Sequence, residues 1–421
     1  MGERRTVLIT NIWLANWAGS EVVVRDLALG LLARGYRPIV YSPMLGSFAQ
    51  TISARGVSVI DDLRQLAEAP DIIHAHHCIP CGEALIRFPD VPAVYVCHAF
   101  NDWLEAPVHF PQVGAYVAVD EACRDRLVHK EGIDPQRVLI LPNAVDLARI
   151  PPRPLPLNER PRRAVAFGKA AAVAELRIAC ERAGIAFDAI GAAAGRVSPV
   201  PEQELVRYDL VFASARSALE AMCCGCAVIV CDGRGLAGLV TSDNFTALRA
   251  MNFGLRSLTE PVTVERCVQE IGRYDPADAS RVAKRARAEA DLGKLIDSYE
   301  SLYEQVLSGA RRPMVTAEAR ERAIARFLHE YLPRRPDDGR WPWLAEREKF
   351  IADIELLQRK IATLTDRVED VQREHTATVR DRDVTRRALD DAHSRLADLQ
   401  RSRVLKIGRF LRRITGFPAR Y

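Results

Sequence analysis

The sequence lacks the long apolar run of a membrane-spanning protein and the leader of a secreted one. Across its 421 residues, no apolar run approaches the roughly 18 to 20 residues that a membrane-spanning helix needs. The N-terminus, MGERRTVLIT, is basic and then apolar, but the apolar part is short and no cleavage site follows it. Residues 6–11 therefore predict a first buried strand rather than a signal peptide, and we expect a cytoplasmic protein.

The sequence also lacks a large excess of either charge. Its 59 Lys and Arg against 55 Asp and Glu leave a net charge of +4, which is too small to indicate a nucleic-acid-binding protein. Ten cysteines occur, mostly in apolar runs, and these predict buried free thiols in a reducing compartment. The length and the 48% hydrophobic content favour two or three globular domains.

Residues 1–150 alternate short apolar runs with helical patterns. Because the runs are apolar throughout, they indicate parallel strands buried on both faces. The segment EVVVRDLALGLLARG between the first two runs predicts an amphipathic helix that ends at Gly35. This βαβ pattern predicts a doubly wound, Rossmann-like domain. The runs are TVLITN, RPIVYSP, VSVID, DIIHAH, PAVYVCH, AYVAVD and RVLILP.

A second α/β pattern follows a stiff linker. Residues 151–162 contain five prolines and no periodic pattern. Residues 163–310 then repeat the alternation, and the helical segment KLIDSYESLYEQVL is expected to close this second half. The predicted fold class is therefore α/β, with two Rossmann-like, doubly wound domains that face a cleft.

The last quarter of the chain has a different pattern. Residues 311–345 are charged and proline-bearing and are expected to be a linker. Residues 346–401 carry a heptad repeat with a polar centre, which predicts a coiled coil that self-associates or binds a partner helix. A single solvated helix is the alternative. Residues 402–421 form a basic amphipathic segment that suits either peripheral contact with an anionic membrane or a protein partner.

Several short motifs occur in a fixed order and resemble a family of known enzymes. They are AGSEVVVRDLALGLLARGYRPIV, DIIHAH, VYVCHAF with His98, LPNAVD and EAMCCGCAVI. In this order and at strand ends, they resemble a GT-B glycosyltransferase of family 4 over residues 6–308. The resemblance implies a metal-independent, retaining transfer of a sugar from a nucleotide-sugar donor to a glycan or lipid-linked acceptor, as in polysaccharide biosynthesis. No cofactor is implied beyond the nucleotide-sugar co-substrate.

The resemblance also assigns roles to individual residues. Glu220 would bind the ribose hydroxyls of the donor, because a carboxylate accepts two hydrogen bonds from a vicinal diol. Lys169 would hold the donor diphosphate and stabilise the departing nucleotide. His98 would lie near the donor sugar. Gly19 would let the first loop approach the diphosphate and acceptor, and Ser214 would contact the donor. Each assignment has a plainer alternative: a helix cap for Glu220, a core histidine for His98 and a solvated loop lysine for Lys169.

The sequence departs from the family pattern at two charged positions. The glutamate expected eight residues before Glu220 is replaced by Phe212, and the second basic residue expected shortly after Lys169 is absent. Arg216 is a candidate replacement for that cation. These departures leave a second hypothesis open, in which the chain is a catalytically weak or inactive binding or scaffold protein that acts through its coiled coil.

A dense His and Cys cluster supports a third hypothesis. It comprises His74, His76, His77, Cys78 and Cys81, and Cys78-Ile-Pro-Cys81 has the spacing of a redox pair or half a zinc site. No second ligand pair lies at a compatible spacing. We therefore expect no metal.

Overall fold

The computed structural model describes most of the chain. The described residues are 4–15, 17, 19–196, 198, 200–311, 315–331, 342–401, 406, 407, 409, 410 and 413. Most of the basic segment 402–421 lies outside them, as does Ala18 beside the predicted loop glycine. The described chain divides into two units, residues 1–331 and 332–421, and each is considered by itself.

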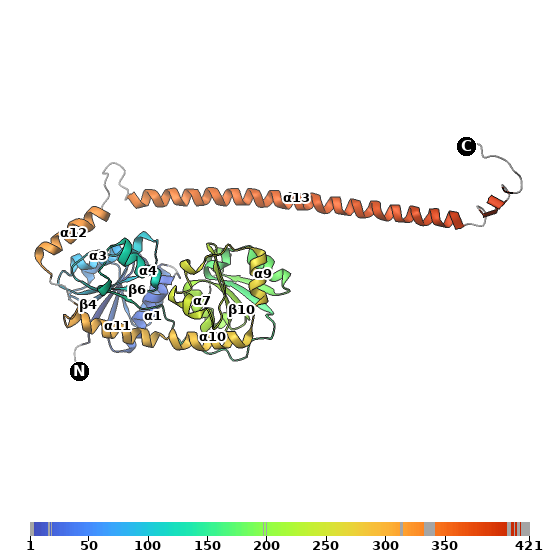
Figure 1. Cartoon of the computed structure of the whole chain (residues 1–421). Coiled ribbons are helices and arrows are strands. Elements are labelled where there is room, and N and C mark those ends of the chain that lie inside the picture. The colour runs from blue at the N-terminus through green and yellow to red at the C-terminus, as the bar shows by residue number, and fades with distance from the viewer. Residues whose placement is uncertain are drawn as a thin grey trace. The chain divides into compact units, whose positions relative to one another are not determined.

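The first sheet has seven parallel strands in the order β3-β2-β1-β4-β5-β6-β7 (Figure 1). Its central strands are buried along their whole length, as their continuous apolar runs predicted. The order of these strands and their parallel direction match the doubly wound pattern. The strands are β1 (Thr6–Thr10), β2 (Arg37–Tyr41), β3 (Ser58–Ile60), β4 (Ile72–His76), β5 (Ala93–Cys97), β6 (Val113–Ala118) and β7 (Val138–Ile140).

Helices connect these strands and cover the sheet. The longest of them, α1 (Gly19–Ala33), buries Val24, Leu27 and Leu31, which recur at helical spacing. Gly35, with φ of 85°, follows its end in the left-handed conformation that the helix stop requires. The other helices are α2 (Ser47–Ser53), α3 (Cys78–Arg87) and α4 (Glu121–Asp125).

The second sheet has five strands in the order β12-β11-β10-β8-β9. Four of them coincide with apolar runs of the sequence, AVAFGK, FDAIG, YDLVFAS and AVIVCD. The fifth, β12, runs antiparallel to β11 and has the sequence GLAGL, whose two glycines lack the β-branched signal of a strand. The strands are β8 (Arg163–Phe167), β9 (Ala186–Ile190), β10 (Leu210–Ala213), β11 (Ala227–Asp232) and β12 (Gly235–Leu239). The helices are α5 (Glu175–Arg182), α6 (Pro201–Leu205), α7 (Ala215–Cys223), α8 (Phe245–Ala250), α9 (Val264–Gly272) and α10 (Pro276–Glu289).

The helix that was expected to close the second domain packs on the first domain instead. Helix α11 (Leu292–Leu307) follows α10, and its Ile296, Tyr299 and Tyr303 join the core of the first sheet. A Cβ at Gly30 of α1 would lie 2.0 Å from the Ile296 side chain, so the two helices approach closely at this glycine. The apolar face of α11 thus finds its partner across the domain boundary, which its own periodicity could not indicate.

The segment expected to be a linker contains another helix of the first domain. Helix α12 (Ala317–Tyr331) buries Ala323 and Phe327 in the first core. Phe327 lies over Gly82 of α3, where a Cβ would come within 2.2 Å of its ring. The prediction that 311–345 is a linker is therefore wrong for residues 317–331. Charged residues recur along α12, and its large apolar residues were too sparse to indicate a buried helix face.

The second unit is dominated by one helix. Helix α13 (Pro342–Arg401) runs for 60 residues and begins four residues before the predicted start. Its described heptad side chains are largely exposed, and the large apolar ones among them are Leu364, Val368, Val371, Leu389, Leu396 and Leu399. Among the described residues, no helix is both long enough and apolar enough to cross a membrane.

Candidate functional site

The predicted site residues follow the carboxyl ends of strands in both sheets. His98 comes directly after β5, Lys169 lies in the turn η5 (Gly168–Ala172) after β8, and Ser214 joins β10 to α7. Gly19 opens α1, and apart from its chain neighbours and its own helix no described atom lies within 4 Å of where its Cβ would be. Because ligands of open α/β sheets bind outside the carboxyl ends of strands, these positions are suited to a ligand.

A row of histidines lies at this edge of the first sheet. The Nδ1 of His76 lies 2.6 Å from the Nε2 of His98, and the two rings stack at 4.8 Å. His74, two residues earlier on the same strand face, bonds through Nδ1 to the Tyr303 hydroxyl at 2.6 Å. The Nε2 atoms of His74 and His76 are buried, and neither has a hydrogen-bond partner among the described atoms.

Burial keeps these histidines neutral. It lowers the pKa of His74 to about 3 and that of His76 well below its usual value, and it also lowers the pKa of His98. A neutral imidazole has one donor and one acceptor nitrogen. The His76–His98 contact therefore needs the proton on one of the two facing nitrogens, so the tautomer of His98 is coupled to that of His76, and His76 positions the His98 ring.

Glu105 and His77 hold the backbone beside His98. Glu105 accepts the His98 backbone N–H at 2.8 Å and lies 3.5 Å from the His77 Nε2. Burial alone would raise the pKa of Glu105, but the hydrogen bond from His77 and the nearby histidines hold it below its usual value. His77 has φ of 64°, a left-handed conformation that is uncommon for histidine and typical of functional or ligand-binding segments.

The Cys78 and Cys81 pair lacks the chemistry of a redox motif. Both side chains are buried at the start of α3, and burial raises the pKa of the Cys78 thiol to about 12 and that of Cys81 well above its usual value. A reactive Cys-x-x-Cys pair has a lowered thiol pKa instead. In the described part of the chain, no three His, Cys, Asp or Glu side chains are arranged to hold a metal ion.

Glu220 lies in a buried charge network rather than alone. Its Oε1 lies 3.1 Å from the Arg216 Nε and 3.3 Å from the Arg149 Nη2. Arg149 also pairs with Glu202 at 2.6 Å. The two arginines therefore fix the orientation of Glu220, whose side chain is 9% exposed. The plainer alternative, in which Glu220 caps or solvates a helix, does not describe this arrangement.

Arg216 links the two domains. Its guanidinium pairs with Asp26 of α1 as well as with Glu220, and it donates to the Ala144 carbonyl at 3.1 Å. Burial alone would raise the pKa of Asp26, but Arg216 and Arg25 hold it below its usual value. The charge of Arg216 is thus neutralised inside the protein, rather than left free for a diphosphate.

The space beside this network is small. A cavity of about 20 Å³ lies among Asp26, Arg216, His74 and Tyr299, which is room for about one water molecule. In this conformation the cavity is too small for a nucleotide, whereas Lys169 of the second domain is exposed.

Lys169 and Ser214 lie close together at the edge of the second sheet. Lys169 is exposed, while the Ser214 hydroxyl donates to Asp232 at 2.6 Å. Gly168 has φ of 67°, and a Cβ there would lie 2.7 Å from the Ser217 hydroxyl, so the Lys169 turn approaches the first turn of α7. Any larger residue at position 168 would push the Lys169 turn away from the first turn of α7.

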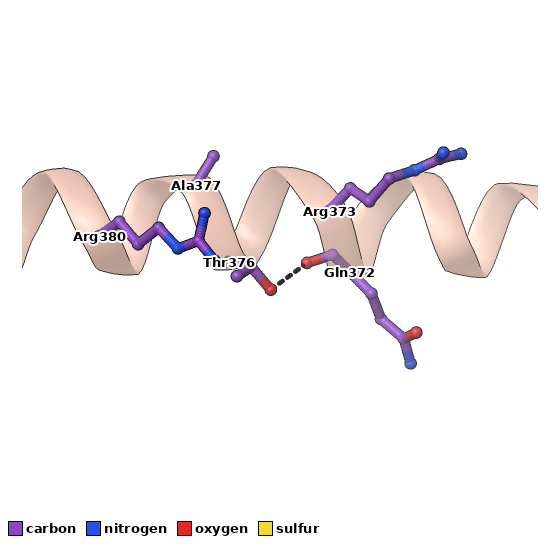
Figure 2. Close-up of a pocket in the computed structure, with 5 residues that line it drawn as sticks. All are labelled: Gln372, Arg373, Thr376, Ala377 and Arg380. Atoms are coloured by element: carbon purple, nitrogen blue, oxygen red, sulfur yellow. Dashed lines mark hydrogen bonds between the residues drawn. The ribbon is translucent and has the colours of Figure 1, made fainter.

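A hollow on α13 is unrelated to this chemistry. Figure 2 shows its five lining residues, all from one helix: Gln372, Arg373, Thr376, Ala377 and Arg380. The hydrogen bond drawn runs from the Thr376 hydroxyl to the Gln372 carbonyl, at 2.8 Å. These residues are exposed and lie outside the two apolar heptad positions. The hollow is thus the outer surface of the helix rather than an enclosed site.

Sequence reasoning missed several members of the site. Asp26, Glu105, Arg149 and Asp232 were not predicted. Asp26 and Arg149 have partners 190 and 53 positions away, whereas Asp232 pairs with Arg234 two positions further on. Asp26 alone carried a readable signal, because it is a charge within the apolar face of α1. A buried charge in such a stripe requires a partner.

The buried histidines predict a pH dependence of stability. The unfolded chain binds protons below about pH 6.5, while the folded chain keeps these rings neutral, so stability falls as pH drops from 7 to 5.5. Each such histidine adds a slope of up to about 1.4 kcal/mol per pH unit. His74→Phe should reduce the slope in urea unfolding, and His129→Gln, at an exposed position, should not. An unchanged slope in His74→Phe would contradict this account.

Comparison with known proteins places these features in a family context. Residues 17–149 match the model of Glycosyltransferase Family 4. A glycosyltransferase from Rickettsia africae aligns with a TM-score of 0.50 at 11% identity, covering 72% of this chain and 99% of that one. The Anabaena protein HepE, solved with UDP and glucose, aligns with a TM-score of 0.51 at 14% identity, covering 70% and 98%. No curated protein matches this sequence. The fold is GT-B, and the N-terminal domain is similar to family 4.

Proposed function

From the GT-B fold and the family 4 match of residues 17–149, we propose that this protein is a glycosyltransferase. It would transfer a sugar from a nucleotide-sugar donor to a glycan or lipid-linked acceptor in the cytoplasm, as part of polysaccharide biosynthesis. The bond between the anomeric carbon and the phosphate oxygen breaks, and the acceptor hydroxyl forms the new glycosidic bond. The hydroxyl proton leaves with the nucleoside diphosphate. Retention of anomeric configuration follows from the family resemblance.

One observation carries the proposal: Glu220 is held rigidly by two arginines at the start of the second domain's site. A carboxylate fixed in this way can accept both hydroxyls of a ribose without an entropic cost of ordering. Lys169, exposed at the same sheet edge, would neutralise charge on the departing diphosphate. In this proposal the protein's cations perform that task, so no metal ion is needed.

A second candidate function is a binding or scaffold protein that does not turn over. Phe212, where the family pattern has its first glutamate, is fully buried in the core of the second sheet. No carboxylate could occupy that position without losing the core packing. The scaffold alternative would keep donor binding and lose transfer.

The test is thermal stability with UDP, GDP, ADP and their glucose conjugates. A ligand at about 100 times its Kd should add roughly 2.7 kcal/mol of stability. A shift with one base, followed by transfer to an acceptor, supports the enzyme. A shift without transfer to any acceptor favours the scaffold, and no shift with any nucleotide contradicts both.

We further propose that α13 mediates self-association. Its apolar heptad positions include Leu364, Val371, Leu389 and Leu396, all more than half exposed on the single chain. Packing them against a second helix would remove this surface from water. Peripheral membrane contact through residues 402–421 remains a separate proposal, since most of that segment lies outside the described residues.

Deleting residues 332–421 should lower the oligomeric state. The remaining residues, 1–331, form a unit of their own, so the truncated protein should still fold. Sedimentation equilibrium of both proteins provides the measurement. Within the full chain, Leu396→Asn should weaken association, while Ala377→Asn on the outer surface should not. Equal masses for the full and truncated proteins would refute self-association through α13.

A further inference from the structure

The family resemblance implies two basic residues at the donor diphosphate, and the second is absent from its expected place. Lys169 provides the first. Arg216 does not provide the second, because its guanidinium is buried between Asp26 and Glu220. Another arginine, Arg234, lies at the same edge of the second sheet, in the turn between β11 and β12.

Arg234 is held in a fixed orientation and remains accessible. Its Nε and Nη2 contact the two carboxylate oxygens of Asp232 at 3.0 and 2.6 Å, and its backbone N–H donates to the same carboxylate at 2.9 Å. Its side chain is 41% exposed. A bidentate contact of this kind fixes the plane of the guanidinium. The Nη1 nitrogen lies outside the pair and can donate to an anion.

Ser214 explains how Asp232 is placed. Ser214 occupies the N-cap position of α7, yet its hydroxyl makes no cap bond and donates to the Asp232 carboxylate instead. Asp232 is 1% exposed, so Ser214 and Arg234 satisfy a buried carboxylate together. Ser214 thus acts on Arg234 through Asp232.

The turn that carries Lys169 is part of the same assembly. It contacts β11, the strand that ends in Asp232, and Gly168 brings it against Ser217 of α7. The two cations therefore come from adjacent loops at one sheet edge. Two exposed positive groups so placed repel one another, and a polyanion between them relieves that repulsion.

We propose that Arg234, oriented by Asp232 and Ser214, forms with Lys169 a two-cation site for the diphosphate of the nucleotide donor. Arg234 supplies the cation that is missing after Lys169, from a different strand of the sheet. This inference rests on the proposed function for the identity of the ligand. It assigns Ser214 an indirect role in place of the direct donor contact that the resemblance implied.

The electrostatics of Lys169 agree with this placement. Protein atoms around its ammonium lower its pKa most, although the side chain as a whole is exposed, and the positive charge of Arg234 lowers it further, while Asp232 opposes both effects. Lys169 thus lies near enough to Arg234 and Asp232 for their charges to act on it.

The test is calorimetric titration of the full-length protein with UDP, GDP, ADP, the matching nucleosides and inorganic pyrophosphate. Arg234→Gln should raise the Kd of the bound nucleoside diphosphate at least tenfold and abolish pyrophosphate binding, while nucleoside binding is unchanged. Arg234→Lys should recover part of the affinity, because it keeps the charge without the fork. The matched control is Arg163→Gln, an exposed arginine paired with Asp188 in the same domain.

The outcomes separate the two proposals. If a nucleoside diphosphate binds equally to wild type and Arg234→Gln, the two-cation site is overturned and the proposed function stands. If pyrophosphate binds through Arg234 but no nucleotide binds, the anion site stands and the proposed function fails. If wild type binds neither pyrophosphate nor any nucleotide, both are overturned.

Discussion

Replacing Glu220 with glutamine is expected to weaken nucleoside diphosphate binding by about tenfold to a hundredfold. The carboxylate would lose two charge-assisted hydrogen bonds to the ribose, and each such bond contributes about 1.5 to 3 kcal/mol. Part of this loss is recovered because the glutamine oxygen still accepts one bond. Since a factor of ten corresponds to about 1.4 kcal/mol, the change is easily resolved by calorimetric titration.

The control for this prediction lies in the same charge network. Glu202 pairs with Arg149 at 2.6 Å, and Arg149 also contacts Glu220. Glu202→Gln therefore disturbs the arginine without removing the proposed ribose acceptor. We expect Glu202→Gln to bind within about threefold of wild type. If the two variants lose affinity equally, Glu220 contributes only to the network, and its assigned donor contact is wrong.

A modified ligand makes the test more specific. Wild type should bind a 2′-deoxynucleoside diphosphate less tightly than the ribonucleotide, because one hydrogen bond to Glu220 is missing. In Glu220→Gln this preference should shrink, since the partner of the hydroxyl has changed. A preference of the same size in both proteins would mean that another residue recognises the ribose.

Most strands of the two sheets were predictable from the sequence. Strand β12 and the packing partner of helix α11 were not. Strands such as β4 and β11 are buried on both faces, so continuous apolar runs identify them. Strand β12 was missed because its glycines carry no local signal. Helix α11 was predicted as a helix but assigned to the wrong domain. Its apolar residues indicate which face of the helix is buried, but they do not indicate which sheet that face packs against.

The same limit applies to the candidate site. Lys169 and Ser214 were singled out because each follows a strand end, and Glu220 because it begins the EAMCCGCAVI motif. The pairing of Asp26 with Arg216 was not predicted, because the two residues lie 190 residues apart in the sequence. No periodicity connects them, and only the folded chain brings them together. The prediction that Arg216 replaces a missing cation failed to anticipate this pairing.

Removing the carboxylate of Asp26 is expected to destabilise residues 1–331 by about 3 to 5 kcal/mol. The side chains of Asp26 and Arg216 are only 4% and 11% exposed, so Asp26→Asn leaves a buried arginine with one neutralising partner fewer. Breaking a buried ion pair at one end costs this much because the remaining charge stays desolvated. Urea unfolding of wild type and Asp26→Asn provides the measurement.

The effect of pH on the stability difference between wild type and Asp26→Asn can also be predicted. The folded pKa of Asp26 lies below its unfolded value, because Arg216 and Arg25 outweigh the effect of burial. Its stabilisation is therefore fully present above about pH 4 and is lost as pH falls further. The difference between wild type and Asp26→Asn should be largest near neutral pH and should close in acid. A constant difference across that range would mean that the charge of Asp26 is not what stabilises the fold.

Two further variants distinguish a broken ion pair from a general packing defect. Glu265→Gln removes a carboxylate from an exposed pair with Arg182 and should leave stability unchanged. The double variant Asp26→Leu with Arg216→Met removes both charges of this pair and should recover part of the loss, because Glu220 keeps Arg149 as a partner and only Arg25 loses the Asp26 carboxylate. If the double variant is as unstable as Asp26→Asn, the shape of these side chains matters more than their charge. If the double variant recovers stability, apolar side chains can replace the ion pair in the fold. The charges of the pair would then serve to hold Glu220 in place across the two domains.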